Sequence, residues 1–586
     1  MKKILSKVLI TSLIMSVVLG GISFVLYRKS ENLQDAKQQR AEEELDLITE
    51  DTMKEAYERR KTTEIVVDSK KPVAPEKVYN GNYTEEQNLV IKKNKKKNLY
   101  DFESPMWIWD LYGTNHLSLY TYFKTTEEAY IRYTIQVKDD TIPNFTRTLN
   151  NDGEGNLTRE HEYQITGFVP GMENLLIMEM YDENDEILNR KVFYLEVPKL
   201  SSGAKTKIEV SSGRSDQQIS NGLYTIFGKK NIWLYDNSGV LRAEIPLMQS
   251  SSQNILEIEG GVYYATDKDQ IVCVNRLGGV RKVYHLGKYE QYDEFMYNGY
   301  GSLWVLVTEP GKKSKSIRDT VISVDLKDKS VHKMFNMERL LPKMESKAKK
   351  EKGQKSLNWI DLNSIEQVNS DEVLVGSREL SSVFKIVNIN SRSPRLSYII
   401  GDRIVWKGTF YDKRVLAKVG QEEADAERAA EQAESILDLG EAEEVFRGNA
   451  GQTRLVRKES ASLSEGQYYL YVWDSNYGYS PTRKDIKWSD LSGVGTAKKD
   501  ARVSYIKKYL IDENNANYNI ENEKEVSYTK TNGSYQEYQK HRIDNYGSEK
   551  GFAEYDSDGR MIRKFEHTNA NVWNIEKRDW KNFWYY

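Results

Sequence analysis

Short apolar strands alternate with polar turns along most of the chain. Beyond about residue 205 one pattern recurs: an apolar strand ends at Asp or Asn, a turn carries Gly or Ser, and a second strand returns. Alternation with a period of two indicates β-strands, and turns of this composition indicate antiparallel hairpins. With one enlarged unit at 467–512, these copies predict a six-bladed β-propeller over residues 205–586. The clearest copies are WLYDNSGVLRAEI, IVCVNRLGGVRKVYHL, VISVDLKDKSVHKMF, FKIVNINSRSPRLSYII and AEYDSDGRMIRKF.

A second group of strands precedes the repeat, at residues 79–200. Its apolar segments are short, rich in aromatic and β-branched residues, and separated by turn residues, which is typical of a small β-sandwich. The segments are MWIWDLYG, LSLYTYF, AYIRYTIQV, EYQITGFV, NLLIMEMYD and KVFYLEV. The predicted fold class is therefore all-β, with an N-terminal β-sandwich followed by the propeller.

The N-terminus departs from this pattern. Val8–Tyr27 is an uninterrupted apolar run that follows three lysines and ends at Arg28 and Lys29. It is long enough to cross a bilayer as a helix, so residues 1–29 predict one transmembrane signal anchor. A cleaved signal peptide is the alternative, although no small-x-small cleavage site precedes Arg28.

Two further segments predict helices outside the β-fold. Residues 31–60 are rich in helix formers and lack Gly and Pro, and two prolines follow in KKPVAPEK. Residues 30–78 are therefore expected to form a helical stalk and a linker. Residues 421–446 are rich in Ala and Glu and predict a helical insertion on a long connection of the propeller.

Composition excludes several classes of function. The net charge of -3 provides no basic field, so nucleic acid is not expected as a partner. The single cysteine, Cys273, excludes internal disulfides and a cysteine-based metal site, and the six histidines include no HExxH pair. The sequence contains no GxSxG or Walker A motif and no GxGxxG opening a βαβ unit. No metal and no cofactor is predicted.

Nine segments, in the same order along the chain, resemble bacterial aryl-sulfate sulfotransferases (arylsulfotransferases). They cover most of residues 80–586 apart from the insertions. The resemblance implies a six-bladed propeller with a sulfuryl-transfer site in its central channel. There a histidine takes the sulfuryl group from an aryl sulfate and passes it to a phenol, without a nucleotide donor. The segments are SPMWIWDLYGTNHLSLYTYFKT, IPNFTRT, REHEYQITGFVPG, WIDLNSI, VGSRELSSVFKI, YIIGD, GQTRLV, YYLYVWDSNYG and GFAEYDSDGRMI.

The resemblance also implies where the site residues lie, and this chain departs from the family at three of them. The family's nucleophilic histidine aligns with Thr453, and two further site histidines align with Asp361 and Gln253. Asn363 matches the family's asparagine, and strand alternation places it on the same face as Asp361. Arg378 falls where the family has a sulfate-binding arginine, whose planar guanidinium matches a sulfuryl group.

These substitutions predict impaired catalysis. A threonine hydroxyl needs a general base, and a sulfated alkoxide leaves far less readily than imidazole. The carboxylate of Asp361 is also expected to repel a sulfate ester. A structural alternative remains for the other positions: Asn363 and Arg378 tie blades together by hydrogen bonds, and Thr453 is an ordinary strand residue.

Three functions follow from the sequence. The first is a catalytically impaired relative that binds a ligand or partner through the propeller. The second is an active aryl-sulfate sulfotransferase with another nucleophile, and the third is a structural scaffold in the cell envelope. Expected partners are the membrane, an aryl sulfate or phenolic small molecule, and a second copy of the chain or an envelope protein. Because the family is exported, we expect a single-pass protein of the cell membrane with most of the chain outside the cytoplasm.

Overall fold

The computed structural model describes residues 64–65, 72–151, 154–249, 251–419, 449–491, 493–568 and 572–586. The predicted anchor at 1–29, most of the predicted stalk at 30–78 and the predicted helical insertion at 421–446 lie outside these residues. Within the described ranges, no helix is long and apolar enough to cross a membrane. The described chain is dominated by β-strands, as the alternation of apolar and polar residues predicts.

The N-terminal strands form one hydrogen-bonded network in the order β1-β7-β6-β3-β2, and β4 and β5 also pair with β3. The first half of β3 pairs with β2 and β5, and its second half pairs with β4 and β6. Trp107 of β2 packs edge-on against Phe193 of β7, with ring centroids 4.9 Å apart. The two halves therefore face each other while sharing β3. The strands are β1 (Glu64–Ile65), β2 (Met106–Trp109), β3 (Leu119–Val137), β4 (Phe145–Thr148), β5 (Thr158–Ile165), β6 (Glu173–Tyr181) and β7 (Ile187–Glu196).

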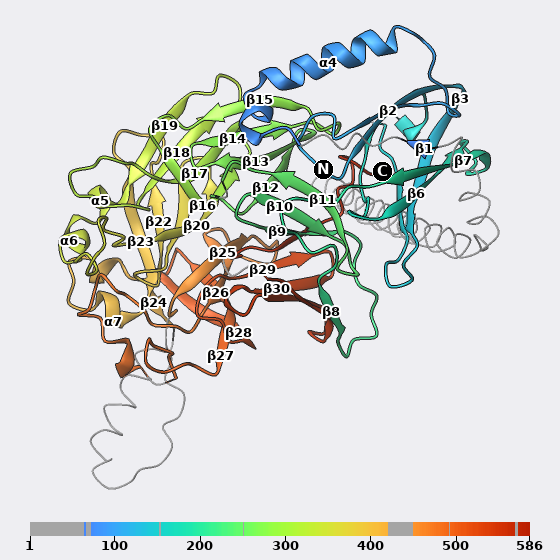
Figure 1. Cartoon of the computed structure of the whole chain (residues 1–586). Helices are drawn as coiled ribbons and strands as arrows, with labels where there is room; N and C mark the ends of the chain where they lie inside the picture. The colour runs from blue at the N-terminus through green and yellow to red at the C-terminus, as the bar shows by residue number, and fades with distance from the viewer. Residues whose placement is uncertain are drawn as a thin grey trace, which may run out of the picture.

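Two helices lie between β1 and β2 in the sequence, α3 (Pro75–Val78) and α4 (Asn82–Lys95). The pattern of strands and turns in the sequence did not predict α4. Only Tyr83, Thr84 and Ile91 are buried in its fourteen residues, so its sequence lacks the wide apolar stripe that marks a packed helix. Figure 1 shows α4 on the outside of the molecule, between the β-domain and the sheet that contains β15.

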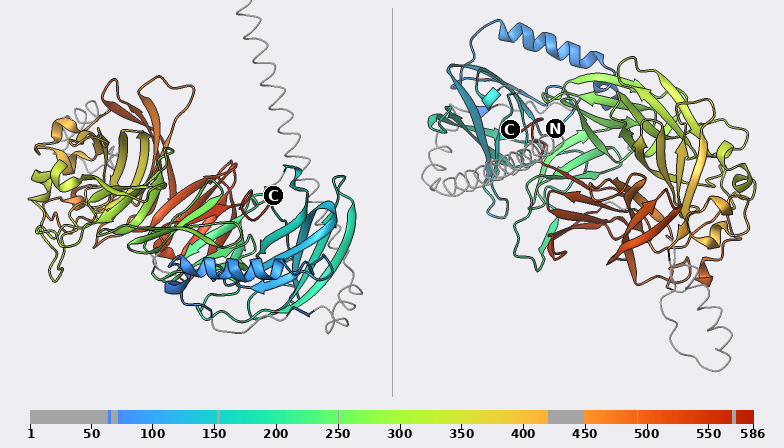
Figure 2. Two further views of the ribbon diagram at one scale, coloured as in Figure 1. Left: turned by 90° about the horizontal axis from the view of Figure 1, so that it is seen from above. Right: turned by 180° about the vertical axis from the view of Figure 1, so that it is seen from behind.

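Six sheets of four or five strands follow one another from β8 to β33. One edge strand of each sheet contacts an edge strand of the next sheet, in the series β12, β16, β20, β25, β29 and β33. Arg578 of β33 donates a hydrogen bond to the carbonyl of Ile255 in β12 at 2.5 Å, which completes the circle. We call this arrangement the propeller-like ring, and the six strands its innermost strands (Figures 1 and 2).

The strands of the ring, taken sheet by sheet, are as follows. Sheet one contains β9 (Leu223–Phe227), β10 (Asn231–Tyr235), β11 (Leu241–Pro246) and β33 (Glu576–Arg578), and sheet two contains β12 (Ile255–Ile258), β13 (Gly261–Asp267), β14 (Gln270–Val274) and β15 (Val280–His285). Sheet three contains β16 (Glu290–Tyr297), β17 (Ser302–Thr308), β18 (Thr320–Asp325) and β19 (Val331–Asn336), and sheet four contains β20 (Leu362–Asn369), β21 (Glu372–Ser377), β22 (Ser382–Val387) and β23 (Arg395–Gly401). Sheet five contains β24 (Ala417–Lys418), β25 (Gln452–Lys458), β26 (Gln467–Asp474), β27 (Val503–Asp512) and β28 (Asn517–Ser527), and sheet six contains β8 (Glu209–Ser212), β29 (Gly533–Tyr538), β30 (His541–Tyr546), β31 (Gly551–Tyr555) and β32 (Met561–Glu566).

The five predicted hairpins are confirmed. They are the antiparallel pairs β10–β11, β14–β15, β18–β19, β22–β23 and β31–β32. The turn residues act as expected: in the last hairpin, the carboxylate of Asp556 accepts hydrogen bonds from the backbone of Asp558 and Arg560.

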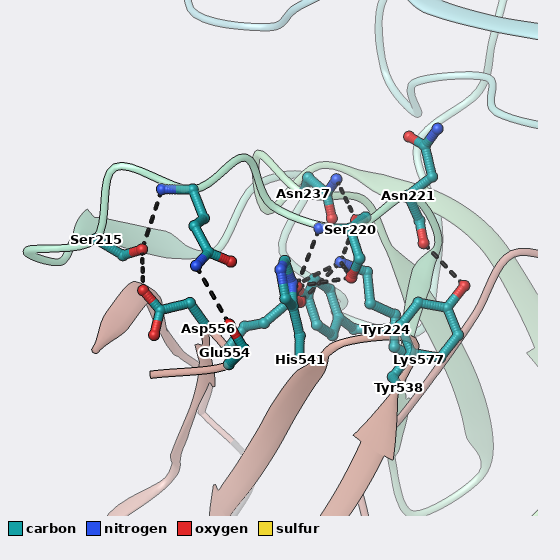
Figure 3. A network of polar contacts seen from close by, with 12 residues as sticks. Ser215, Ser220, Asn221, Tyr224, Asn237, Tyr538, His541, Glu554, Asp556 and Lys577 are labelled. Carbon is teal, nitrogen blue, oxygen red and sulfur yellow. Dashed lines mark hydrogen bonds and ion pairs between the residues drawn. The ribbon is translucent and has the colours of Figure 1, made fainter. Parts of the chain in front are cut away.

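The two ends of the ring sequence interlock. β8 is added to the outer edge of sheet six by pairing with β32, whereas β33 supplies the innermost strand of sheet one by pairing with β9. A buried polar network fixes this closure (Figure 3). Lys577 Nζ lies 2.8 Å from Glu554 Oε2 and also contacts Ser220 and Tyr224, and both charged side chains are fully buried. The ion pair therefore links β33 of sheet one to β31 of sheet six, and Ser220 and Tyr224, near the start of the ring sequence, hydrogen-bond to the same two charged groups.

The β-domain and the ring share one apolar core. Trp584 and Tyr585, at the C-terminus, belong to the same buried cluster as strands of both parts. Trp584 Nε1 donates to Gln164 at 3.0 Å, and the hydroxyl of Tyr585 lies 2.6 Å from that of Thr166. The chain end therefore packs against the β-domain after completing the ring.

Candidate functional site

A cluster of charged side chains lies at the start of the innermost strand β20. Arg318 donates through Nη1 to Asp361 at 2.7 Å and through Nη2 to Asp293 at 2.8 Å. All three residues have left-handed backbone conformations, with φ of 50° at Asp293, 54° at Arg318 and 49° at Asp361. Such conformations are strained for residues other than glycine and persist only where the surroundings enforce them.

The two carboxyl groups of this cluster differ in their proton affinity. Burial raises the pKa of Asp293 to about 6, and the charge of Arg318 opposes this only in part. Burial also acts to raise the pKa of Asp361, but the charges of Arg318 and Arg378 outweigh it and hold that pKa below its usual value. Asp361 is therefore an ion-paired carboxylate near neutral pH, and much of its expected repulsion toward an anion is offset by Arg318.

Arg378 lies beside this cluster, and its guanidinium forms no ion pair with the carboxylates there. Its backbone N–H donates to the carbonyl of Asp361 at 3.1 Å, which holds the residue in place. Its Nε is buried without a hydrogen-bond partner, and among the described residues its guanidinium forms no ion pair. A buried, unsatisfied donor is costly, so it marks a position that a ligand can satisfy.

Two stacked tyrosines lie near Arg378. Tyr477 and Tyr479 have ring centroids 5.6 Å apart and an interplanar angle of 19°. Ser480 donates to the carbonyl of Glu379 at 2.5 Å, which brings the tyrosine segment next to the arginine. Tyr479 is 37% exposed. A cation beside partly exposed aromatic rings suits a ligand that combines an aromatic ring with a negative charge.

The three other predicted positions tie sheets together. The hydroxyl of Thr453 in β25 donates to the carbonyl of Gly533 in β29 at 2.5 Å. Asn363 Nδ2 donates to the carbonyl of Gln452 at 2.8 Å. Gln253 Oε1 accepts from the backbone of Trp573 at 2.9 Å. These contacts fit the structural alternative for Asn363 and Thr453, whereas the environment of Arg378 fits a binding role.

None of the six histidines, all of which are described, lies on an innermost strand. His116 pairs with Asp110 at 2.7 Å, and His161 is buried against Phe123, so both belong to the packing of the β-domain. The other four are His285 in β15, His332 in β19, His541 in β30 and His567 after β32.

Sequence reasoning missed the residues that organise the cluster. Arg318 and Asp293 lie outside every family motif that we recognised, and no local pattern links them to Asp361. Arg454 lies within the motif GQTRLV, but nothing in that motif indicates its partner Glu294, which belongs to another sheet and also accepts a hydrogen bond from the backbone of Ile365 at 3.1 Å. These contacts join residues far apart in sequence, so only the folded ring brings them together.

Comparison with known families agrees with the six motifs that lie in the ring and does not extend to the three in the N-terminal β-domain. The family model for arylsulfotransferase (ASST) matches residues 209–582. A search of curated proteins gave no match. Among solved structures, a functionally unknown protein from Desulfotomaculum acetoxidans DSM 771 has a TM-score of 0.31 and 8% identity, covering 68% of this chain and 95% of its own. BamB from Moraxella catarrhalis has a TM-score of 0.27 and 9% identity, covering 62% and 91%. Neither likeness bears on function. Because the family match spans more than half of the sequence, the chain belongs to the arylsulfotransferase (ASST) family.

Proposed function

We propose that this chain is a catalytically impaired arylsulfotransferase that binds an aryl anion at its ring without transferring a sulfuryl group. The observation that carries the proposal is the state of Thr453, at the position of the family's nucleophile. Its hydroxyl hydrogen is donated to Gly533 O, and no histidine lies on an innermost strand. A hydroxyl in this state lacks the base that a serine or threonine nucleophile requires.

The same region keeps what binding needs. Arg378 offers an unsatisfied guanidinium donor, and Tyr477 and Tyr479 offer aromatic faces. The left-handed backbone at Asp293, Arg318 and Asp361 is maintained by the charge cluster. Left-handed residues also occur elsewhere in the described chain, but here three of them are joined by one group of ion pairs, which holds their relative positions.

The wider organisation is part of the proposal. We propose that the six sheets act as a six-bladed propeller that displays this site. We also propose that the apolar run Val8–Tyr27 anchors the chain in the cell membrane as a single span, with the β-domain and ring outside the cytoplasm. The length of that run and the export of the family support this location.

Turnover and binding separate the three candidate functions. The purified natural chain is incubated with an aryl sulfate and a phenol acceptor, and we expect no release of the phenol that the aryl sulfate carries. The variant Thr453→His tests whether a histidine at this position restores transfer. Thr453→Asn, similar in size but without a nucleophile, is its control. Turnover by the natural chain would overturn the proposal in favour of an active enzyme with another nucleophile.

Binding of the same aryl sulfate is measured by calorimetry. Arg378→Gln is expected to weaken it roughly tenfold or more, because a charge-assisted hydrogen bond is lost. Arg392→Gln removes the same charge from an exposed position and is expected to leave binding unchanged. If the natural chain neither turns over nor binds, the scaffold function stands instead.

A further inference from the structure

The surface around α4 combines exposed lysines with exposed apolar side chains. Residues 92–97 contain five lysines, of which four are exposed. Leu89 is 68% exposed, Val90 45% and Leu99 72%. These are three of the ten large hydrophobic residues exposed in the described chain, and they lie within eleven residues. Isolated exposed apolar residues are ordinary, but a group beside a lysine cluster marks an interaction surface.

Helical geometry places the two kinds of side chain on one face. Lys92, Lys93 and Lys96 follow Leu89 by three, four and seven positions, so they lie on the same side of the helix. α4 touches the rest of the molecule on its other side, where Thr84 accepts a hydrogen bond from the backbone of Val280 at 2.9 Å. Figure 1 shows α4 along the outer edge of the molecule.

A cavity of about 520 Å³ lies against this helix, between α4 and the β-domain. Its walls include Lys92, Lys96 and Lys124, and none of these ammonium groups forms an ion pair with a described residue. The two carboxylates of the wall are already engaged. Glu162 pairs with Lys95 at 2.7 Å, and Glu160 accepts from the hydroxyl of Tyr122 at 2.8 Å. The hydroxyl of Tyr122 does not neutralise Glu160, but four lysines against two carboxylates give the walls of the cavity a net charge of +2.

The acidic residues of α4 lie at its other end. Glu85 and Glu86 occupy the first two turns, and Glu86 lies 3.9 Å from Lys77. The charge on the exposed face therefore becomes positive toward the C-terminal end of the helix, where the apolar residues and the cavity also lie.

We infer that this surface docks on an anionic lipid bilayer. Headgroup phosphates lie against Lys92, Lys96 and Lys124, and Leu89 enters the boundary between headgroups and acyl chains. A lysine cluster close to a membrane is attracted to anionic headgroups, and an exposed apolar side chain beside it strengthens binding when it enters the interface. The inference rests on the proposed anchor, which holds this segment close to a bilayer. Docking here would fix how the ring is presented above the membrane.

A label on α4 tests the inference in the full-length chain. Cys273, the only cysteine, is buried and is replaced by Ser, and Leu89→Cys receives a fluorophore. The chain is reconstituted in nanodiscs of phosphatidylcholine alone or mixed with phosphatidylglycerol, each containing a lipid-borne quencher. Quenching is expected in the anionic discs only and is expected to decline as salt is added.

Charge removal gives the matched comparison. The triple variant K92Q/K93Q/K96Q is expected to lower the ratio of docked to undocked chain by roughly a hundredfold, from about fivefold per lysine. K349Q/K350Q/K352Q removes the same charge from another exposed basic run and is expected to leave quenching unchanged. Absence of quenching in anionic discs that retain the chain overturns the inference. Failure of the chain to remain with the discs overturns the anchor instead, and the docking is then measured by adding vesicles of the same lipids.

Discussion

Two groups of buried charges hold the ring together, and they differ in how completely their hydrogen bonds are satisfied. At the closure, Glu554 accepts from Ser220 at 2.6 Å, lies 2.8 Å from Lys577 and pairs with His541 at 2.6 Å. At the candidate site, Arg318 bridges Asp293 and Asp361, but the Nε of the neighbouring Arg378 has no partner. The charged groups at the closure have hydrogen-bond partners, whereas the candidate site contains a donor without one.

The proton affinities follow the same division. Burial alone would raise the pKa of Glu554, but Lys577, Ser220 and Tyr224 lower it to about 2. In contrast, burial raises the pKa of Asp293 to about 6. The charge of Arg318 only partly opposes this rise, since the same guanidinium also pairs with Asp361. A fully matched buried charge stabilises the fold, whereas at the candidate site two carboxylates share one guanidinium and the donor open to a ligand is that of Arg378.

The largest expected effect comes from breaking the closure. Lys577→Met leaves Glu554 as an unpaired buried carboxylate, and we expect the free energy of unfolding to fall by about 3–5 kcal/mol in urea denaturation. Lys564→Met removes a lysine from an exposed pair with Glu566 and is expected to cost less than about 1 kcal/mol. Equal losses for the two variants would contradict the distinction between buried and exposed pairs.

The two carboxylates are expected to give opposite pH dependences. For Glu554 the pKa in the folded state, about 2, is below the usual 4.5, so its stabilisation is present above 4.5 and is lost as the pH falls toward 2. The loss is roughly 3 kcal/mol. For Asp293 the pKa in the folded state, about 6, is above the usual 3.8, so its contribution is present below 3.8 and is lost as the pH rises through 6. Because this side chain is 15% exposed, we expect a smaller change of about 2 kcal/mol.

Chemical denaturation across this pH range measures both effects. Glu554→Gln is expected to remove the acid-side dependence, and Asp293→Asn is expected to remove the dependence near pH 6. If both variants changed the same side of the profile, the two groups would not differ as the structure indicates.

The smallest expected effect concerns Thr453. Thr453→Val removes the hydrogen bond to Gly533 O and is expected to cost about 1 kcal/mol of the free energy of unfolding. Thr453→Ser keeps a hydroxyl and serves as the control. A valine variant as stable as the natural chain would show that the hydroxyl is not committed to Gly533, which would favour a chemical role for it.

Local sequence patterns predicted much of the fold but only part of the site. The five hairpins were predictable because strand alternation and turn residues act over a few positions. The candidate positions Asp361, Asn363 and Arg378 followed from family motifs. Helix α4 was missed because its apolar stripe is too narrow to distinguish it from a polar linker. Arg318 was missed because nothing near it in the sequence indicates the two carboxylates that it bridges.

The sequence by itself determined the β-class, the repeated hairpins and the family, since each depends on neighbouring residues or on short motifs in a fixed order. Tertiary structure alone decided which strands close the ring. β33 enters sheet one beside β9, and β8 joins sheet six beside β32, and these pairings span almost the whole ring sequence. It also decided that Asp361 is neutralised by Arg318 and that Thr453 is bound to Gly533. The physical reason is that hydrogen bonds and ion pairs depend on distance in space, and only closure of the ring brings these groups within reach.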